Sequence, residues 1–216
     1  MSAKPVSLIW ITPNAQDTIV YCARVSNPHS QEEGKNPERL LNYLVKHKHW
    51  SPFEMASACF EINTTRDISA QILRHRSFSF QEFSQRYAEV QQRPEIPSLR
   101  RQDLTNRQNS IDDLDPYDSQ GLQTEIARHF VESERLYLRL LEFGVAKECA
   151  RKVLPINSPT RLYMSGTIRS WIHYLSVRTG VETQLEHRQI ALAIAEILSE
   201  QLPSLSNLIT NQSNDT

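Results

Sequence analysis

The sequence feature that most constrains the fold is a series of apolar residues at helical spacing in the second half of the chain. The series consists of Leu122, Ile126, Phe130, Tyr137 and Leu141. Residues at these intervals lie on one face of a helix, so they predict an amphipathic helix over 119–143 that Gly144 ends. We expect this face to pack into the core.

Two earlier segments have the composition of strands. Residues 6–12 are apolar and β-branched and stop at Pro13, which predicts a first strand. Residues 55–62 alternate small or apolar side chains with Ser57 and Glu61, which predicts a second strand.

Helix signals lie between and after these strands. Asn36 can cap a helix that has Pro37 at its first position and ends near His49. Further helices are predicted over 16–25, 66–73, 146–154, 160–177 and 183–201. Residues 93–116 are rich in Pro, Arg, Asn and Asp without a clear period, which predicts an irregular surface segment or lid.

The length and composition are those of an ordinary globular protein. The chain has 216 residues, of which 39% are hydrophobic and 23% charged, and this length favours one domain. We expect that domain to span residues 1–206. The polar residues 207–216 are expected to form a disordered tail.

The overall charge excludes some classes of partner. Lys and Arg number 24 and Asp and Glu 25, so no positive field of the whole molecule attracts nucleic acid or an acidic membrane surface. The apolar run 6–11 is too short for a signal-peptide core or a membrane span. The expected location is therefore the cytoplasm.

The three cysteines are Cys22, Cys59 and Cys149, which are widely spaced and form no Cys-x-x-Cys pair. This pattern argues against a disulfide framework and against a structural zinc site. We expect small buried apolar residues and no metal site.

Positive charge is concentrated in residues 74–87, RHRSFSFQEFSQRY. This segment contains three arginines and one histidine but a single acid, Glu82, and residues 66–107 contain eight arginines against five acids. These cations have too few local carboxylates to be explained as surface salt bridges. The planar guanidinium group suits bidentate contact with phosphate, so we expect a local anion site.

The spacing predicts how this site is assembled. Gln71 and Arg74 are expected on one face of a helix, and Ser84 and Arg86 on one side of an extended segment, so that one pocket collects both pairs. Two other interpretations stay open. The arginines can complement a helix dipole, or they can form a stacking surface for single-stranded nucleic acid with the neighbouring aromatic residues.

Arg74-His75-Arg76, seven further residues and Ser84 resemble the RHR-x7-S signature of the flavin-dependent thymidylate synthases. Three further segments resemble motifs of that family in the same order. They are residues 49–54 (HWSPFE), residues 150–155 (ARKVLP) and the pair Arg169 and Arg178. The resemblance covers residues 24–197.

The resemblance implies an α+β fold with a central, largely antiparallel β-sheet flanked by helices and a helix-rich C-terminal half. It implies a homotetramer whose active sites are shared between subunits. The implied reaction is the reductive methylation of dUMP to dTMP with 5,10-methylenetetrahydrofolate, non-covalently bound FAD and NADPH. The implied ligands are therefore dUMP and folate, with no nucleic acid and no membrane as partners.

The resemblance also implies which residues bind the ligands. For dUMP they are Gln71, Arg74, Glu82, Phe83, Ser84, Gln85, Arg86, Arg151 and Arg178. For FAD they are Ser26, His49, Ser51, Glu54, Arg74, His75, Arg76, Gln81, Glu82, Thr167, Arg169 and His173. Many relatives have Asn where this chain has Gln81, Thr167 and His173, although all three can form hydrogen bonds.

Arg178 matches the arginine implicated in ionising N3 of the uracil ring. A permanently charged guanidinium group cannot act as a base, so its expected role is to stabilise negative charge that develops on the pyrimidine. No protein nucleophile is expected. Cys149 has no neighbouring base, and no His-Asp pair is placed to activate Ser84.

Two other functions remain to be weighed against this one. A binder of single-stranded nucleic acid would show steep salt dependence, and the near-zero net charge argues against it. A flavoprotein oxidase or reductase that has lost the nucleotide reaction would not need Arg74, Ser84, Arg86 and Arg178.

Overall fold

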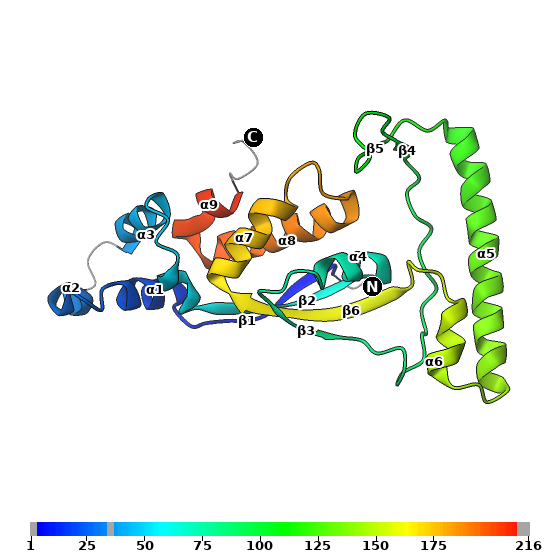
Figure 1. Cartoon of the computed structure of the whole chain (residues 1–216), viewed down its shortest axis with the longest axis horizontal. Coiled ribbons are helices and arrows are strands. Elements are labelled where there is room, and N and C mark those ends of the chain that lie inside the picture. Colours follow the sequence, from blue (N-terminus) through cyan, green and yellow to red (C-terminus); the bar gives the residue numbers. More distant parts are fainter. Residues whose placement is uncertain (1–3, 34–36, 211–216) are drawn as a thin grey trace. The chain divides into compact units, whose positions relative to one another are not determined.

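The computed structural model describes residues 4–33 and 37–210. The main sheet has four strands in the order β1 (Val6–Ile11), β2 (Ser57–Thr65), β6 (Pro159–Thr167) and β3 (Ser79–Glu82) (Figure 1). β1 and β2 are antiparallel, with Val6 opposite Ile62 and Ile11 opposite Ala58. Helices flank this sheet, so the expected α+β fold is confirmed.

The chain divides into two compact units whose segments alternate along the sequence. The first unit contains the residues up to Ile62, Leu73–Gln81 and the residues from Tyr163 onwards. The second contains Asn63–Ile72 and Glu82–Leu162. The single domain over residues 1–206 that the chain length indicates stays a prediction.

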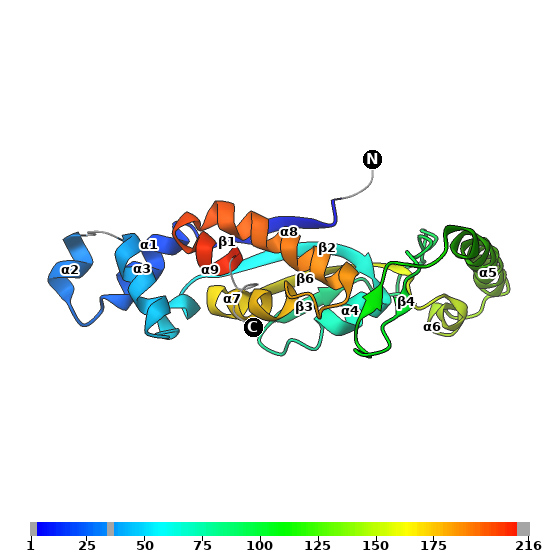
Figure 2. The same cartoon turned by 90° about the horizontal axis from the view of Figure 1, so that it is seen from above.

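Two helices of the first unit, α7 (Ile168–Arg178) and α8 (Leu185–Gln201), lie side by side on one face of the sheet (Figures 1 and 2). Trp171 anchors α7 to β2. Its ring packs edge-on against Phe60 with the centroids 4.9 Å apart, and its Nε1 donates to the Ala58 carbonyl at 3.2 Å. All three residues are fully buried.

The other elements of the first unit are short. They are α1 (Ala15–Ala23), α2 (Pro28–Glu33), α3 (Pro37–Lys46), η1 (Ser51–Glu54), η3 (Pro203–Leu205) and α9 (Ser206–Thr210), where η denotes a 3₁₀ helix. Asn36, the predicted cap of α3, lies outside the described residues. Residues 207–210, expected in the polar tail, belong to α9, in which Ile209 is buried. Residues 211–216 lie outside the described residues.

The end of α3 places His49. Lys48 has a φ of 55°, the left-handed conformation, and the His49 N–H donates to the Leu44 carbonyl at 2.8 Å. The Lys48 N–H donates to the Val45 carbonyl at 3.0 Å. Together these bonds form a Schellman motif, in which glycine is usual at the left-handed position. The helix therefore ends close to the predicted residue.

In the second unit, the predicted long helix is present as α5 (Pro116–Glu142). It begins earlier than expected because the Asp115 carboxylate accepts two backbone N–H bonds, at 2.9 and 3.2 Å, and Pro116 occupies the first position. Gly144, with a φ of 76°, follows its end, as predicted. The apolar face is buried at Phe130 and Tyr137 but exposed at Leu122.

The segment 93–116 contains a short hairpin of β4 (Arg101–Gln102) and β5 (Ser110–Ile111), so it is not irregular throughout. In its turn, Asp103 Oδ1 accepts the backbone N–H of Thr105 at 2.8 Å and of Asn106 at 3.1 Å. These bonds hold the pKa of Asp103 well below its usual range. The remaining helices of this unit are α4 (Arg66–Ile72), α6 (Lys147–Ala150) and η2 (Arg151–Val153).

The helix predicted over 160–177 is wrong in its first half, because Pro159–Thr167 form strand β6 and α7 begins at Ile168. The buried side chains of the strand are Thr160, Leu162 and Met164. They alternate along the chain, which is the period of a strand. Thr167 then caps α7 by accepting the Ser170 N–H at 3.2 Å. Within the described residues, no helix is both long enough and apolar enough to cross a membrane.

β6 carries Gly166 where the strand passes the ring of Phe78. A Cβ added at Gly166 would lie 2.7 Å from Phe78 Cε1. The Phe78 ring has little room to move, because it is buried and packs edge-on against Trp171 with the centroids 4.6 Å apart. Gly166 therefore allows the segment that follows Arg76 to close onto the strand.

We predict that Gly166→Ala lowers the free energy of unfolding by about 1–3 kcal/mol, because the added methyl group has to displace the Phe78 ring. A matched control is Gly121→Ala in α5, where an added Cβ meets nothing within 4 Å. The control should raise the free energy of unfolding by about 0.5–1 kcal/mol. Chemical denaturation measures both variants. Equal tolerance of the two substitutions would show that Phe78 does not pack tightly on β6.

Candidate functional site

A part-buried polar contact in the first unit joins Arg178 and His75. Arg178 lies in the last turn of α7, and its Nε donates to His75 Nε2 at 2.9 Å. A guanidinium group can only donate hydrogen bonds, so His75 Nε2 must carry the lone pair. The imidazole is therefore neutral, with its proton on Nδ1.

The surroundings of His75 keep it in this neutral form. Burial, the positive charge of Arg178 and the neighbouring His173 together lower its pKa to about 4, with burial the largest cause. His75 therefore stays uncharged at physiological pH and can accept the Arg178 hydrogen bond.

Two aromatic residues that sequence analysis did not single out surround this contact. The ring of Tyr174 packs edge-on against His75 with the centroids 4.9 Å apart, and the Tyr174 hydroxyl forms a hydrogen bond of 3.0 Å with His187 Nε2. Both Tyr174 and His187 are fully buried. Burial raises the pKa of Tyr174 and lowers the pKa of His187 to about 4.

A signal for His187 is present in the sequence. It lies within the first turn of α8, one turn before Ile190 and Ala191, and shares the buried face of the helix with them. A polar residue on such a face needs a hydrogen-bonding partner. The sequence alone does not say which partner that is.

The predicted flavin residues other than Glu82 all belong to the first unit. Those with exposed side chains are Ser26, His49, Ser51, Glu54, Arg74, Arg76, Gln81, Arg169 and His173, whereas His75 and Thr167 are half-buried. Arg169, in the first turn of α7, forms an ion pair with Glu54 of η1. The structure therefore brings two of these predicted residues together from distant parts of the sequence.

Arg74 and Arg76 differ from Arg169 in their surroundings. α4 ends at Ile72, so both arginines lie in the turn that follows it, and the predicted helical face shared by Gln71 and Arg74 is wrong. Among the residues that the structure describes, neither arginine has a carboxylate partner. Two exposed guanidinium groups are therefore available to an anion.

In the second unit, Glu82 at the end of β3 collects three donors on one oxygen. Oε1 accepts hydrogen bonds from Ser69 at 2.7 Å and from Thr160 at 3.0 Å, and it lies 2.7 Å from Arg66 Nη1. These contacts join β3 to α4 and β6 within this unit. The carboxylate of Glu82 therefore stabilises the fold through Oε1, and its role as a ligand stays a prediction.

Residues 84–87 form a turn rather than the extended segment that was predicted. The N–H of Tyr87 donates to the Ser84 carbonyl at 3.1 Å, and the N–H of Arg86 to Ser84 Oγ at 3.4 Å. Arg86 Nε also contacts Glu148 at 3.3 Å. Both side chains of that ion pair are more than half exposed, so the contact is weak and can be exchanged for another anion.

Gln85, in the same turn, has an unusual environment. Its side chain is buried, and Nε2 has no hydrogen-bond partner among residues 4–33 and 37–210. A buried amide without a partner is destabilising, so a donor left in this state marks a position where a ligand acceptor can bind.

Gln71 and Arg151 also belong to the second unit, on α4 and at the start of η2, and both are half-buried. Phe83 lies between β3 and the turn, and its N–H donates to the Arg161 carbonyl at 2.8 Å. The predicted dUMP residues are thus divided, with Arg74 and Arg178 in the first unit and the others in the second.

The donors present suit phosphorylated ligands. Arginine, histidine and serine side chains and turn N–H groups are the usual partners of phosphate oxygens. Within residues 4–33 and 37–210, no group of three or more His, Cys, Asp or Glu residues that could hold a metal ion occurs. Cys22, Cys59 and Cys149 are free thiols. Cys59 is buried, as expected, but Cys22 is half-buried and Cys149 is exposed, so the expected burial of all three is wrong.

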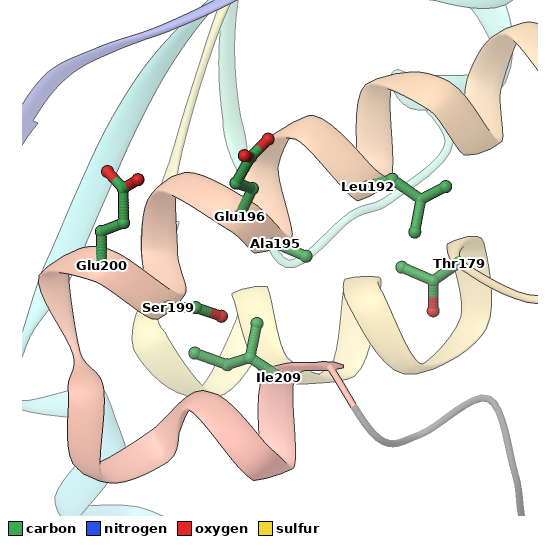
Figure 3. A pocket seen from close by; sticks show the side chains of 7 residues that line it. All are labelled: Thr179, Leu192, Ala195, Glu196, Ser199, Glu200 and Ile209. Atoms are coloured by element: carbon green, nitrogen blue, oxygen red, sulfur yellow. The ribbon is translucent and has the colours of Figure 1, made fainter.

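A pocket of about 450 Å³ lies elsewhere in the first unit, among α7, α8 and α9 (Figure 3). Its lining is mainly apolar and includes Leu192 and Ile209, with Glu196 and Glu200 from α8. None of the predicted ligand-binding residues lines it. Because the pocket contributes carboxylates and no cation, we do not assign a nucleotide to it.

The sequence is similar to proteins of one family over nearly its whole length. The model of the family described as thymidylate synthase complementing protein matches residues 7–204. A probable flavin-dependent thymidylate synthase of Paramecium bursaria Chlorella virus 1 is 47% identical over 213 residues, which are 97% of this chain and 99% of the relative. A flavin-dependent thymidylate synthase of Synechocystis sp. is 50% identical over 188 residues, 87% of this chain and 86% of the relative.

The fold is similar to a crystal structure as well. A UMP/dUMP methylase from Streptomyces cacaoi, bound with 5-Br dUMP, superposes with a TM-score of 0.84 at 27% identity, over 95% of this chain and 94% of the methylase. Agreement of sequence and fold over this length shows that the chain belongs to the family of flavin-dependent thymidylate synthases.

Proposed function

We propose that this chain catalyses the reductive methylation of dUMP to dTMP. In this proposal 5,10-methylenetetrahydrofolate is the carbon donor, FAD is the non-covalently bound cofactor and NADPH is the reductant. The observation that carries this proposal is Arg178, a guanidinium group fixed by a neutral histidine, in a chain that is 50% identical to one flavin-dependent thymidylate synthase over 188 residues. The methylase bound to a dUMP analogue supports dUMP as the substrate.

The residues proposed to hold FAD are the predicted residues of the first unit together with Glu82. A bound flavin supplies hydride-transfer chemistry. Arg74 and Arg76 have the charge and exposure needed to bind its diphosphate, since neither has a carboxylate partner among the described residues. His49 is held at the end of α3 by the Schellman motif, which gives a loop residue a defined backbone position.

The residues proposed to hold dUMP are Gln71, Arg74, Glu82, Phe83, Ser84, Gln85, Arg86, Arg151 and Arg178. Ser84, Arg86 and the turn N–H groups supply donors for the phosphate. The unpartnered Nε2 of Gln85 supplies a further buried donor. We assign each residue a binding role and no covalent role.

Arg178 is proposed to act on the pyrimidine. Its Nε–H donates to His75, and its two terminal nitrogens, which have no partner among the described residues, can donate to a ligand. They can stabilise negative charge that develops on the ring as C5 becomes nucleophilic. The positive charge is permanent, so this stabilisation does not depend on a proton transfer by the side chain.

The proposal also includes the assembly and location of the protein. We propose a homotetramer with active sites shared between subunits, located in the cytoplasm, without nucleic acid or membrane as a partner. A shared site means that the arginines of the two units need not meet within one chain.

The first experiment is an assay of the purified protein. We expect the protein to be yellow, to form dTMP from dUMP and methylenetetrahydrofolate, and to oxidise NADPH faster when dUMP is present. A colourless protein that FAD does not reconstitute would contradict the proposal. Tight, salt-dependent binding of oligonucleotides without dTMP formation would instead support a single-strand binder.

Arg178→Ala should reduce dTMP formation by about 100-fold or more, because a charged donor to the transition state is lost, while bound flavin is retained. Absorbance of the bound flavin and a radiochemical dTMP assay measure the two properties. Arg135→Ala is a matched control, since Arg135 forms an exposed ion pair with Glu132 within α5, and it should leave both unchanged. Normal turnover of Arg178→Ala would refute the role of this arginine.

Gln85→Leu should weaken dUMP binding by about 10-fold, because a buried donor to the ligand is lost. The same change should leave the ligand-free protein as stable as the wild type or more stable, since no described residue bonds to Nε2. Calorimetric titration with dUMP and chemical denaturation test the two effects. Lost stability with unchanged dUMP affinity would mean that Gln85 serves the fold.

A further inference from the structure

His75 is held in place mainly by packing. Among the residues that the structure describes, its side chain accepts one hydrogen bond, from Arg178 Nε at 2.9 Å. The ring contacts Tyr174 edge-on at a centroid distance of 4.9 Å and an interplanar angle of 78°. His187 lies behind it at 6.4 Å and 85°. The direction of the His75 lone pair therefore depends on where these two rings lie.

The two rings are fixed by their own hydrogen bond. The Tyr174 hydroxyl and His187 Nε2 are 3.0 Å apart, and both side chains have 0% exposure. Removal of either group would leave the buried polar atom of the other without this hydrogen bond, which favours reorientation of the remaining ring. Tyr174 is four residues before Arg178 on α7, so both side chains lie on the same helical face.

We propose that the buried pair Tyr174–His187 is a positioning element for Arg178: it fixes the His75 ring in the orientation in which Nε2 accepts the Arg178 Nε–H. Tyr174 and His187 touch neither substrate nor cofactor in this account. They act through His75, which fixes the plane of the Arg178 guanidinium group. The inference rests on the proposed function, because the consequence for turnover requires that Arg178 acts on dUMP.

The charges around the pair agree with a neutral cluster. Among the described residues, the charged or titratable groups that act on the pair or on His75 are Arg178 and His173 from α7 and His75 itself, from the segment after α4. None of these is acidic, and Arg178 is already positive. A proton on either imidazole is therefore unfavourable, and the pKa values of His75 and His187 are both about 4.

This pKa shift gives stability a pH dependence. A histidine whose pKa is lower in the folded than in the unfolded protein stabilises the fold fully above pH 6.5, its ordinary pKa. That contribution is lost as the pH falls from 6.5 towards 4. Removal of the imidazole in His187→Leu should therefore make the stability less sensitive to pH in this interval.

The test uses Tyr174→Phe, His187→Leu and the double variant in the full-length, flavin-loaded protein. We expect each single variant to lower kcat for dTMP formation by about 10-fold, because misplacement of a group at the site by less than an ångström has effects of this size. The double variant should lose no more than the single variants. His187→Gln, whose amide can bond to the Tyr174 hydroxyl, should recover most of kcat.

A second readout does not depend on turnover. In the ¹⁵N-histidine NMR spectrum, wild-type His75 should show one neutral tautomer with the proton on Nδ1, and Tyr174→Phe should give an average of two tautomers. Tyr137→Phe is the matched control, because it removes a buried hydroxyl that accepts the Val90 N–H in the second unit. It should change neither kcat nor the His75 signal.

The outcomes separate the two proposals. If the wild type forms no dTMP, the proposed function fails, and the His75 spectrum still decides whether the pair positions that ring. Three results would refute the positioning role. The first is a fall in kcat only in proportion to the folded fraction, and the second is a double variant in which the two single losses multiply. The third is a His75 spectrum that is unchanged in Tyr174→Phe.

Discussion

The account depends on one hydrogen bond, in which the Arg178 Nε–H is accepted by a neutral His75. A protonated histidine would repel the positive charge of a neighbouring arginine. That repulsion is absent, because burial, with smaller contributions from Arg178 and His173, lowers the pKa of His75 to about 4 and keeps the imidazole neutral. The guanidinium group thus gains an uncharged partner that fixes its plane and leaves its positive charge uncompensated. A carboxylate in the same place would have held the arginine as well but cancelled its charge.

The other arginines of residues 74–87 also keep their positive charge available to a ligand. Arg74 and Arg76 are exposed and have no carboxylate partner among the described residues, and the Arg86–Glu148 contact is too exposed to hold Arg86 strongly. The chain as a whole has a net charge of −1. Local positive charge in a nearly neutral chain favours a small anionic ligand over a long polyanion.

Much of the fold was predictable because its signals are local. The helix α5 has a periodic apolar face and a glycine at its end, and β1 is a run of apolar residues before a proline. The strand β6 was missed because its residues also fit a helix that continues into α7, and only the burial of alternate residues distinguishes the two. The resemblance to the family supplied the site residues. It did not supply Tyr174 or His187, because their roles depend on contacts between α7 and α8.

The central claim is that this chain transfers a one-carbon unit to dUMP with a flavin as the reductant. The most direct measurement is an anaerobic single turnover of the reduced, flavin-loaded protein with dUMP and methylenetetrahydrofolate. The account predicts one dTMP formed for each flavin oxidised, and none when dUMP or the folate is omitted. Oxidation of the flavin at the same rate without dTMP would contradict it.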